Sequence, residues 1–363
     1  MLFFRLSSFY FFYFAAVGVY IIFLPKVLND IGYTPSEIGI VLALAPLMRF
    51  LTPFLFLKHI SLDQKLFKYT LILSISSASL FYLTIEHFYL FMFNNALLGV
   101  CLSLILPYIE LIAIKELKNK YGKSRLYGSI GFALVGLVIA EILIEPSIVL
   151  DFYLATTILT AFFAYSLIKY DEEEELSYNQ NTEKFSLLKH WAFWVSLFLM
   201  QMSFGAYYNF FTIYENEHGI SLQTVSYLWT FAIICEVLMF YYQAPLLKKN
   251  LIAVIKFSIL ITAIRWLLLF LFPDSLYISY TTQAMHALSF GLYHSAVILY
   301  LYELYSNKKL SQQFMLGIAY GLGGFSGSIV SGYYYGTYLF LVSSFIAILA
   351  LLFLYHKSNL KNS

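Results

Sequence analysis

The sequence predicts an all-helical membrane protein in which twelve transmembrane helices form two six-helix halves. Three observations support this fold class: the composition, the lengths of the apolar segments and the placement of the positive charges. Of the 363 residues, 61% are hydrophobic and only 12% are charged, whereas a soluble domain carries about 25% charged residues. So few charged side chains cannot cover a soluble particle of this size. Most of the surface is therefore expected to face lipid.

The apolar segments divide into twelve stretches of about 20 residues, the length of a helix that crosses the hydrocarbon core. In the first half we predict helices at 4–24, 37–57, 67–85, 89–114, 126–144 and 149–168. In the second half we predict helices at 191–214, 222–247, 252–272, 276–305, 313–335 and 337–355. Pro25 and Lys26 follow the first stretch in place of a small-residue cleavage site. We therefore expect a retained helix there, not a signal peptide.

The longest loop, 169–190, separates the two halves and contains the acidic run Asp171, Glu172, Glu173, Glu174 and Glu175. We predict an N-terminal half at 1–168, a cytoplasmic linker at 169–190 and a C-terminal half at 191–363. A charge run in a linker is usually solvated chain, and we prefer this interpretation to a docking site. Two six-helix halves around a central polar site are typical of secondary transporters that alternate between inward-open and outward-open states.

The positive charges predict the orientation, because cytoplasmic loops hold an excess of Lys and Arg. With the N-terminus inside, 19 of the 22 Lys and Arg residues fall in inner segments. Of the other three, Lys26 lies in an outer loop, and Arg49 and Arg265 lie within predicted helices. We expect an integral protein of the plasma membrane, which is the inner membrane in a bacterium, with both termini in the cytoplasm.

The composition also argues against several classes of protein and partner. Cys101 and Cys235 lie inside apolar runs far apart in the sequence, which excludes a disulfide scaffold. The net charge of +2 argues against nucleic acid as a partner. The histidines lack further ligands at a recognisable spacing, so we expect no metal site and no cofactor. No nucleophile beside a base and no phosphate-binding loop is recognisable, which argues against an enzyme. A channel is a further alternative, which saturable uptake with counterflow would exclude.

An ionisable side chain at bilayer depth is costly unless it faces a cavity or a partner, so each one is a candidate functional residue. Glu141 lies near an outer loop and can reach the interface. Arg49 lies deep in its helix and needs a partner, in either a structural or a functional role. Six residues fall in this class: Arg49, Glu110, Glu141, Glu236, Arg265 and His286.

Two groups of ionisable residues predict a site, and the first pairs Glu110 with Arg125 at the start of the next helix. Glu110 and Arg125 flank a short basic loop, so their side chains can approach as a charge pair, although Arg125 can also be an interface anchor. Glu236, Arg265 and His286 lie on three successive helices away from the loops. A carboxylate beside a movable cation can take up and release a proton; the alternative is a static buried salt bridge. The predicted helix 191–214 adds a polar and aromatic lining for a ligand ring, although any single ring is by default packing: Tyr207, Tyr208 and Asn209.

Several motifs resemble the major facilitator superfamily of transporters. YGKSRLYGSIGF at 121–132 and PYIE at 107–110 resemble its lactose permease branch. This resemblance implies that Glu110 and Arg125 bind substrate, with Phe132 where the permease has a tryptophan that stacks on the sugar. The chain more closely resembles the 3-phenylpropionate transporter group of the superfamily, through GAYYNFFTIY at 205–214, YLWTFAIICEVLMF at 227–240, AIRW at 263–266 and QAMHALSFGLYHSA at 283–296.

The resemblance also implies a role in proton coupling. Arg265 and His286 match charged residues that the permease uses for this purpose, but its proton-carrying acid is replaced here by Ser289. Glu236 is then the best candidate for carrying the proton. We expect a monomeric secondary transporter that moves a small organic solute, an aromatic or other carboxylate, together with a proton. The alternative is a nucleoside or oligosaccharide symporter that also uses a proton.

Overall fold

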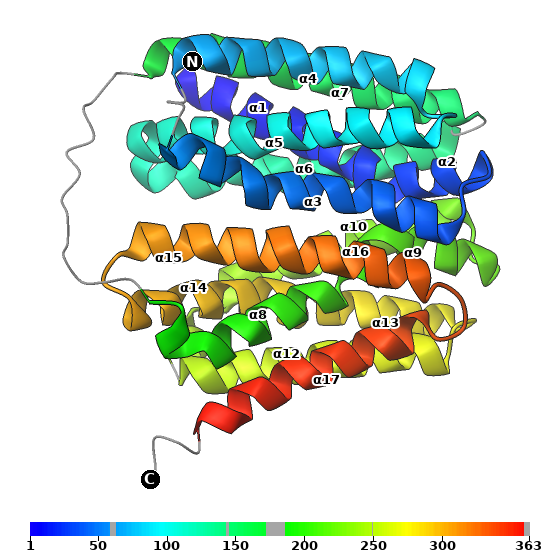
Figure 1. Cartoon of the computed structure of the whole chain (residues 1–363), viewed down its shortest axis with the longest axis vertical. Coiled ribbons are helices and arrows are strands. Elements are labelled where there is room, and N and C mark those ends of the chain that lie inside the picture. Colours follow the sequence, from blue (N-terminus) through cyan, green and yellow to red (C-terminus); the bar gives the residue numbers. More distant parts are fainter. Residues whose placement is uncertain (59–62, 143–144, 172–185, 249, 359–363) are drawn as a thin grey trace. The chain divides into compact units, whose positions relative to one another are not determined.

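The computed structural model describes residues 1–58, 63–142, 145–171, 186–248 and 250–358. Within these ranges the secondary structure is helical and contains no β-strand, so the all-helical prediction is confirmed (Figure 1). Ten helices of the described residues are long and apolar enough to cross a membrane. Helices suit a lipid environment because each one satisfies its own backbone hydrogen bonds.

The chain forms two compact units, and the first comprises Met1–Glu175 and Ser221–Thr230. Its first apolar helix is continuous through a π-helical turn, because α1, η1 and α2 follow one another without a break. The elements of this unit are α1 (Leu2–Gly18), η1 (Val19–Phe23), α2 (Leu24–Asp30), α3 (Pro35–Lys58), α4 (Gln64–Thr84), α5 (Phe88–Leu117), η2 (Lys118–Lys120), α6 (Tyr121–Ile142), α7 (Pro146–Leu167) and η3 (Ile168–Tyr170).

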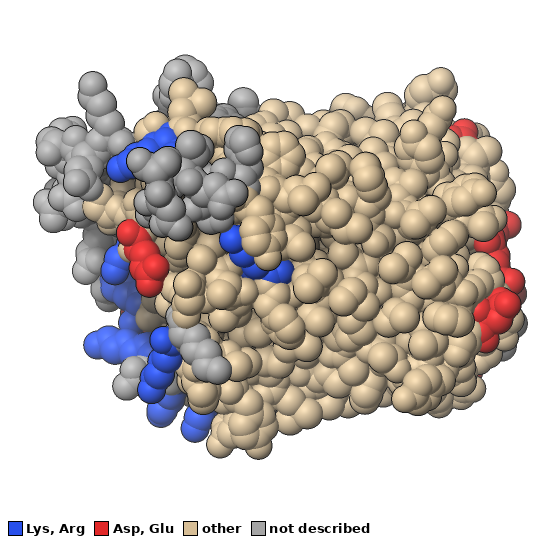
Figure 2. Space-filling view, turned by 90° about the horizontal axis from the view of Figure 1, so that it is seen from below, with Lys and Arg blue, Asp and Glu red and all other residues tan. Residues whose placement is uncertain are grey.

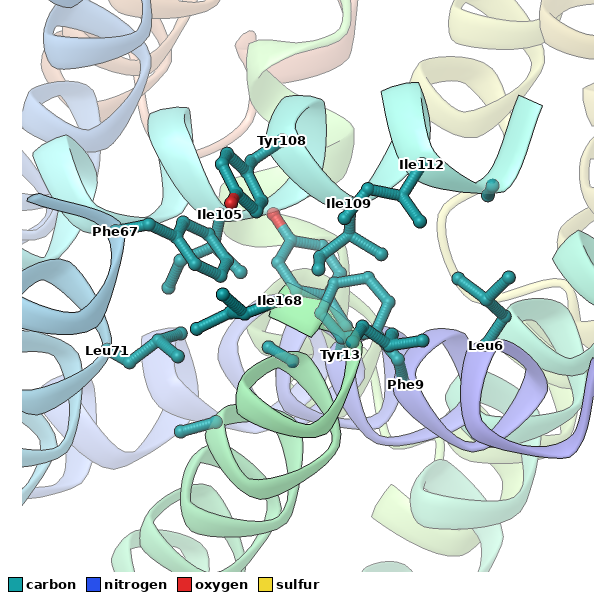
Figure 3. Packing of buried hydrophobic residues seen from close by; sticks show 14 of the residues in the cluster. Leu6, Phe9, Tyr13, Phe67, Leu71, Ile105, Tyr108, Ile109, Ile112 and Ile168 are labelled. Atoms are coloured by element: carbon teal, nitrogen blue, oxygen red, sulfur yellow. The ribbon is translucent and has the colours of Figure 1, made fainter. Parts of the chain in front are cut away.

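Buried apolar side chains from five elements, α1, α4, α5, α7 and η3, hold the first unit together (Figure 3). The rings of Phe67 on α4 and Tyr108 on α5 stack with their centroids 3.7 Å apart. The backbones of α1 and α6 also approach closely, since a Cβ added to Gly131 would lie 2.1 Å from the carbonyl oxygen of Phe11. The cluster in Figure 3 includes Leu6, Phe9 and Tyr13 of α1, Phe67 and Leu71 of α4, Ile105, Tyr108, Ile109 and Ile112 of α5, and Ile168 of η3.

The second unit comprises Leu176–Ile220 and Phe231–Ser363. Helix α10 is therefore shared, with its first turns in the first unit and the remainder in the second. The elements are η4 (Leu188–His190), α8 (Trp191–Ser203), α9 (Gly205–Glu217), α10 (Leu222–Tyr242), α11 (Ala244–Leu247), α12 (Leu251–Leu271), α13 (Leu276–His286), η5 (Ala287–Leu292), α14 (Tyr293–Leu304), α15 (Lys308–Met315), η6 (Leu316–Gly323), α16 (Gly324–Tyr333) and α17 (Leu339–Ser358).

Two predicted helices, 191–214 and 222–247, are divided in the structure, and three others, 4–24, 276–305 and 313–335, contain a π-helical segment. The segment 191–214 breaks at Phe204, where a Cβ on Gly205 would lie 2.2 Å from the backbone of Gly327. The segment 222–247 ends at Tyr242, and a short separate helix follows that has Pro245, which lacks a backbone N–H, in its first turn. The segment 313–335 contains the π-helical η6. Each interruption depends on packing or backbone chemistry that apolar length alone does not reveal.

Charged side chains are unevenly distributed on the face shown in Figure 2. Lys and Arg gather at one end of this face, and most of its Asp and Glu residues lie at the opposite end, with a largely uncharged surface between them. Such a surface matches a lipid-facing zone with polar rims. Of the acidic run, residues 172–175 lie outside the described residues. Its first residue, Asp171, accepts a hydrogen bond from the Tyr108 hydroxyl at its carboxylate and one from Gln64 Nε2 at its backbone carbonyl.

Candidate functional site

The first unit contains an ion pair between α5 and α6. Glu110 lies two turns before the end of α5 and Arg125 one turn into α6, so the short η2 connection brings them together. Arg125 Nε donates to Glu110 Oε1 over 3.2 Å. The Tyr121 hydroxyl donates to the same oxygen over 3.4 Å. The Arg125 and Glu110 side chains are 34% and 29% exposed, which leaves both accessible to a small molecule.

Aromatic rings surround the Arg125 guanidinium. Its central carbon lies 4.1 Å from the centroid of the Phe14 ring and 5.3 Å from that of Tyr10. Two rings against a guanidinium stabilise its charge by cation–π attraction. Farther along α6, the buried ring of Phe132 lies 6.1 Å from that of Trp229, between centroids. Arg125 and Phe132 therefore both lie in aromatic surroundings within the first unit.

Arg49 on α3 differs from Arg125 in its contacts. Among the described residues no carboxylate forms an ion pair with Arg49, and its side chain is exposed. Glu141 is exposed at the end of α6 and accepts hydrogen bonds from Gln223 and Tyr227.

The second unit contains a buried polar cluster around Arg265 of α12. This side chain is fully buried, and its Nη1 donates to His286 Nδ1 over 2.9 Å and to Ser289 Oγ over 3.3 Å. Its Nη2 donates to Gln283 Oε1 over 3.4 Å. The Tyr207 hydroxyl donates to the same Gln283 oxygen, and its ring centroid lies 4.3 Å from the guanidinium carbon. Arg265 is thus held by neutral groups and aromatic rings.

His286 connects Arg265 to Glu236 of α10. A guanidinium can only donate, so His286 Nδ1 accepts and the imidazole proton lies on Nε2. This nitrogen lies 3.4 Å from Glu236 Oε2. The arrangement is a charged guanidinium, a neutral imidazole and a carboxylate in line. Such a chain can move a proton when the guanidinium shifts, because the imidazole gains a second protonation site when Nδ1 is released.

A π-helical turn supports this chain. The segment η5 follows His286 directly and contains Ser289 and Gly291. A Cβ on Gly291 would lie 3.2 Å from Cγ of Glu236, so the glycine lets α10 approach this turn. Single π-helical turns occur frequently at functional sites. Neither the turn nor the contacts of Ser289 and Gln283 were expected from the sequence.

The other predicted lining residues take different positions. Tyr207 is buried in the Arg265 cluster, and Tyr208 stacks on Phe204 with centroids 5.7 Å apart. Asn209 points to α16 instead, where its Nδ2 donates to Ser328 Oγ over 2.7 Å. The structure therefore brings Tyr207 together with Arg265, His286 and Glu236 but does not bring Asn209 there.

His294 is separated from His286 by a ring. Phe290 stacks on His286 at 5.2 Å and on His294 at 6.1 Å, between centroids. His294 Nδ1 is hydrogen-bonded to the Tyr320 hydroxyl over 2.7 Å. A cavity of about 10 Å³ adjoins these two residues, enough for about one water molecule. Within the described residues, no group of three His, Cys, Asp or Glu side chains could hold a metal ion.

One buried acid was missed by the sequence analysis. Glu215 on α9 is fully buried, and Ser279 Oγ of α13 donates to its Oε2 over 2.9 Å. It lies one residue beyond the predicted helix 191–214 and therefore outside the segment that apolar length indicates. The apolar residues before Glu215, such as Phe211 and Ile213, and Ile220 after the next turn are a sequence signal that this helix end is buried.

The comparisons with known proteins agree with this architecture. The sequence model of the family described as "MFS_1 like family" matches residues 3–347 of this chain. A protein of Escherichia coli strain K12 named "Probable 3-phenylpropionic acid transporter" is 24% identical over 347 residues, covering 88% of this chain and 86% of that protein. The "Uncharacterized transporter YwbF" of Bacillus subtilis strain 168 is 24% identical over 312 residues, which is 82% of this chain and 77% of that protein.

Two solved structures show the same fold. The nucleoside transporter NupG has a TM-score of 0.78 at 16% sequence identity, covering 97% of this chain and 98% of that one. A bacterial homologue of the human lysosomal transporter Spinster has a TM-score of 0.73 at 11% identity, covering 98% of this chain and 96% of that one. The family match over residues 3–347 and the ten apolar helices define an integral membrane transporter of the major facilitator type, not an enzyme. The chain belongs to the MFS_1 like family, as the motifs predicted.

Proposed function

We propose that the protein moves a small organic carboxylate with an aromatic or other apolar body across the membrane together with a proton. The observation that carries this proposal is the accessible Arg125 guanidinium, which has Glu110 on one edge and rings against its faces. A carboxylate can bind the remaining N–H groups of a guanidinium in a bidentate manner. The name of the Escherichia coli relative supports an aryl carboxylate as substrate.

Of the two candidate anion anchors, the geometry favours Arg125 over Arg265. Arg265 is fully buried and already donates to His286, Ser289 and Gln283. A solute reaches it only after this cluster rearranges. We therefore propose that Arg125, with Glu110 and Phe132, binds the solute first. Four further residues are proposed for the site once the second unit rearranges: Tyr207, Tyr208, Asn209 and Arg265.

Glu236 and His286 are proposed to carry the coupled proton. The neutral imidazole lies between the buried cation and the carboxylate, so a shift of Arg265 changes the electrostatic cost of protonating either group. Proton and solute loading would then shift the balance between the two open states. Replacing Glu236 with Gln is expected to abolish concentrative uptake and to leave solute exchange intact. Loss of neither activity would remove Glu236 from the mechanism.

The membrane arrangement is part of the proposal. To the ten apolar helices we add the α8 and α9 pair and the shorter apolar helix Leu339–Tyr355, which makes twelve spans. We propose a monomer with halves at 1–168 and 191–363 joined by a linker at 169–190. The excess of Lys and Arg in alternate loops supports cytoplasmic termini in a plasma membrane, which is the inner membrane in a bacterium.

A ligand screen by thermal shift tests the substrate class. The purified protein is melted with 3-phenylpropionate, lactose or uridine, because a ligand that binds only the folded state stabilises it by about 2.7 kcal/mol at 100 times its Kd. We expect a shift with 3-phenylpropionate that is lost in Arg125→Gln. A loss only in Arg265→Gln would move the anchor to Arg265. A shift only with lactose or uridine would overturn the carboxylate in favour of a sugar or nucleoside.

A further inference from the structure

Glu215 is buried, and the described part of the chain places no cation beside it. The side chain is 0% exposed, and no Lys, Arg or His nitrogen of the described residues forms an ion pair with it. Its Oε2 accepts one hydrogen bond, from Ser279 Oγ, and its Oε1 has no hydrogen-bond partner among the described residues. An ionised carboxylate in such a place carries a large desolvation penalty, whereas the neutral acid does not.

The ionisable groups around Glu215 do not supply the missing charge. The Tyr214 hydroxyl donates to the Leu269 carbonyl over 3.0 Å, and the His218 ring donates from Nδ1 to the Tyr214 carbonyl over 2.7 Å. On the loop after α16, the Tyr335 hydroxyl donates to Glu217. The ionisable groups that interact with Tyr214 or Glu217 beside Glu215 include His218 at the end of α9, Asp274 from the turn after α12, and Tyr335 from the loop after α16.

The position of Glu215 also separates it from the cluster around Arg265. Glu215 belongs to the last turn of α9 and Tyr207 to the first, and these residues are eight positions apart, or about 12 Å of helix rise. Ser279 lies on α13 two turns before His286. Helices α9 and α13 therefore carry both the Arg265 cluster and Glu215. Glu215 lies at the C-terminal end of α9, and its partner Ser279 lies in the first turn of α13.

We propose that Glu215 is a second proton-binding carboxyl of this transporter, held neutral while α9 and α13 are packed together at Ser279. Ionisation then requires these helices to separate enough for water to reach the carboxyl. Proton release at Glu215 would thus accompany opening of this end of the second unit. This role differs from that of Glu236, which has an imidazole partner.

Infrared difference spectroscopy of the purified protein in lipid tests this assignment without a substrate. The carbonyl of a protonated carboxyl absorbs apart from ionised carboxylates and backbone amides. Glu215→Gln is therefore expected to remove one such carboxyl band at neutral pH. The matched control is Glu217→Gln, which changes an exposed acid two residues away and is expected to keep the band. In D2O the Glu215 band is expected to shift slowly, because the buried proton exchanges only when the helices separate.

A spectrum of Glu215→Gln that matches the wild-type protein in this band would overturn the proposal, as would a band that exchanges at once in D2O. If Glu215→Gln fails to fold, Ser279→Ala provides the second test. This variant keeps the acid but removes its hydrogen bond, so the wild-type band is expected to move to higher frequency. An unmoved band would overturn the proposal. The outcome does not depend on which solute the protein carries.

Discussion

Arg265 donates a hydrogen bond to His286 Nδ1 over 2.9 Å, and this single contact fixes the imidazole as the neutral tautomer with its proton on Nε2. The same contact opposes a second proton on the ring, because Nδ1–H would face the guanidinium. His286 therefore joins a buried cation to Glu236 without itself being charged. A static salt bridge would have placed the carboxylate directly on Arg265, and the structure has an imidazole between them.

The first prediction concerns the hydrogen bond that Arg265 donates to His286 Nδ1. Asn at this position keeps an oxygen acceptor near Nδ1, whereas Ala leaves a buried Arg265 hydrogen bond unmade. A hydrogen bond to a charged group contributes about 1.5 to 3 kcal/mol. We expect His286→Ala to lower the melting temperature of the purified protein by several degrees and His286→Asn to lower it less. Equal melting of His286→Ala and the wild-type protein would show that the contact with Arg265 does not stabilise the fold.

The second prediction separates stability from binding at Glu110 and Arg125. Because about a third of each side chain is exposed, the ion pair is worth only about 0.2 to 1 kcal/mol. Glu110→Gln is therefore expected to melt within a few degrees of the wild-type protein and yet to lose at least tenfold in solute uptake. Asp30→Asn, which breaks the exposed pair with Lys26, is the control and is expected to leave uptake unchanged. Equal uptake by all three proteins would exclude the pair from the site.

Sequence reasoning grouped residues that a short connection brings close, and also the ionisable residues Glu236, Arg265 and His286 on successive helices. Glu110 and Arg125 flank a connection of one short turn, so their approach follows from the helix boundaries. Gln283 and Ser289 complete the Arg265 cluster from a helix with a π-helical turn, and periodicity alone does not predict that turn. Glu215 was missed because burial at a helix end depends on which neighbours cover it, and Ser279 lies 64 residues away.

The third prediction concerns the close contact of α1 and α6. A Cβ at Gly131 would lie 2.1 Å from the Phe11 carbonyl oxygen, so a backbone must move. Overpacking of this kind costs about 1 to 3 kcal/mol, and Gly131→Ala is expected to melt several degrees lower. Gly122→Ala on the same helix is the control, since among the described residues no heavy atom beyond its own turn and chain neighbours lies within 4 Å of its added Cβ. Melting of both variants at the wild-type temperature would contradict the backbone contact.

The last prediction concerns orientation in the membrane. If the termini are cytoplasmic, the turn at Glu86 faces the outside and the turn at Lys120 faces the cytoplasm; both side chains are exposed. In a background with Cys101→Ala and Cys235→Ala, an impermeant maleimide added to intact cells is expected to label Glu86→Cys and not Lys120→Cys. Permeabilised cells are expected to show labelling of both, which controls for reactivity. The reverse pattern in intact cells would show that the termini lie outside. The excess of Lys and Arg would then lie in the outer loops, contrary to the positive-inside rule.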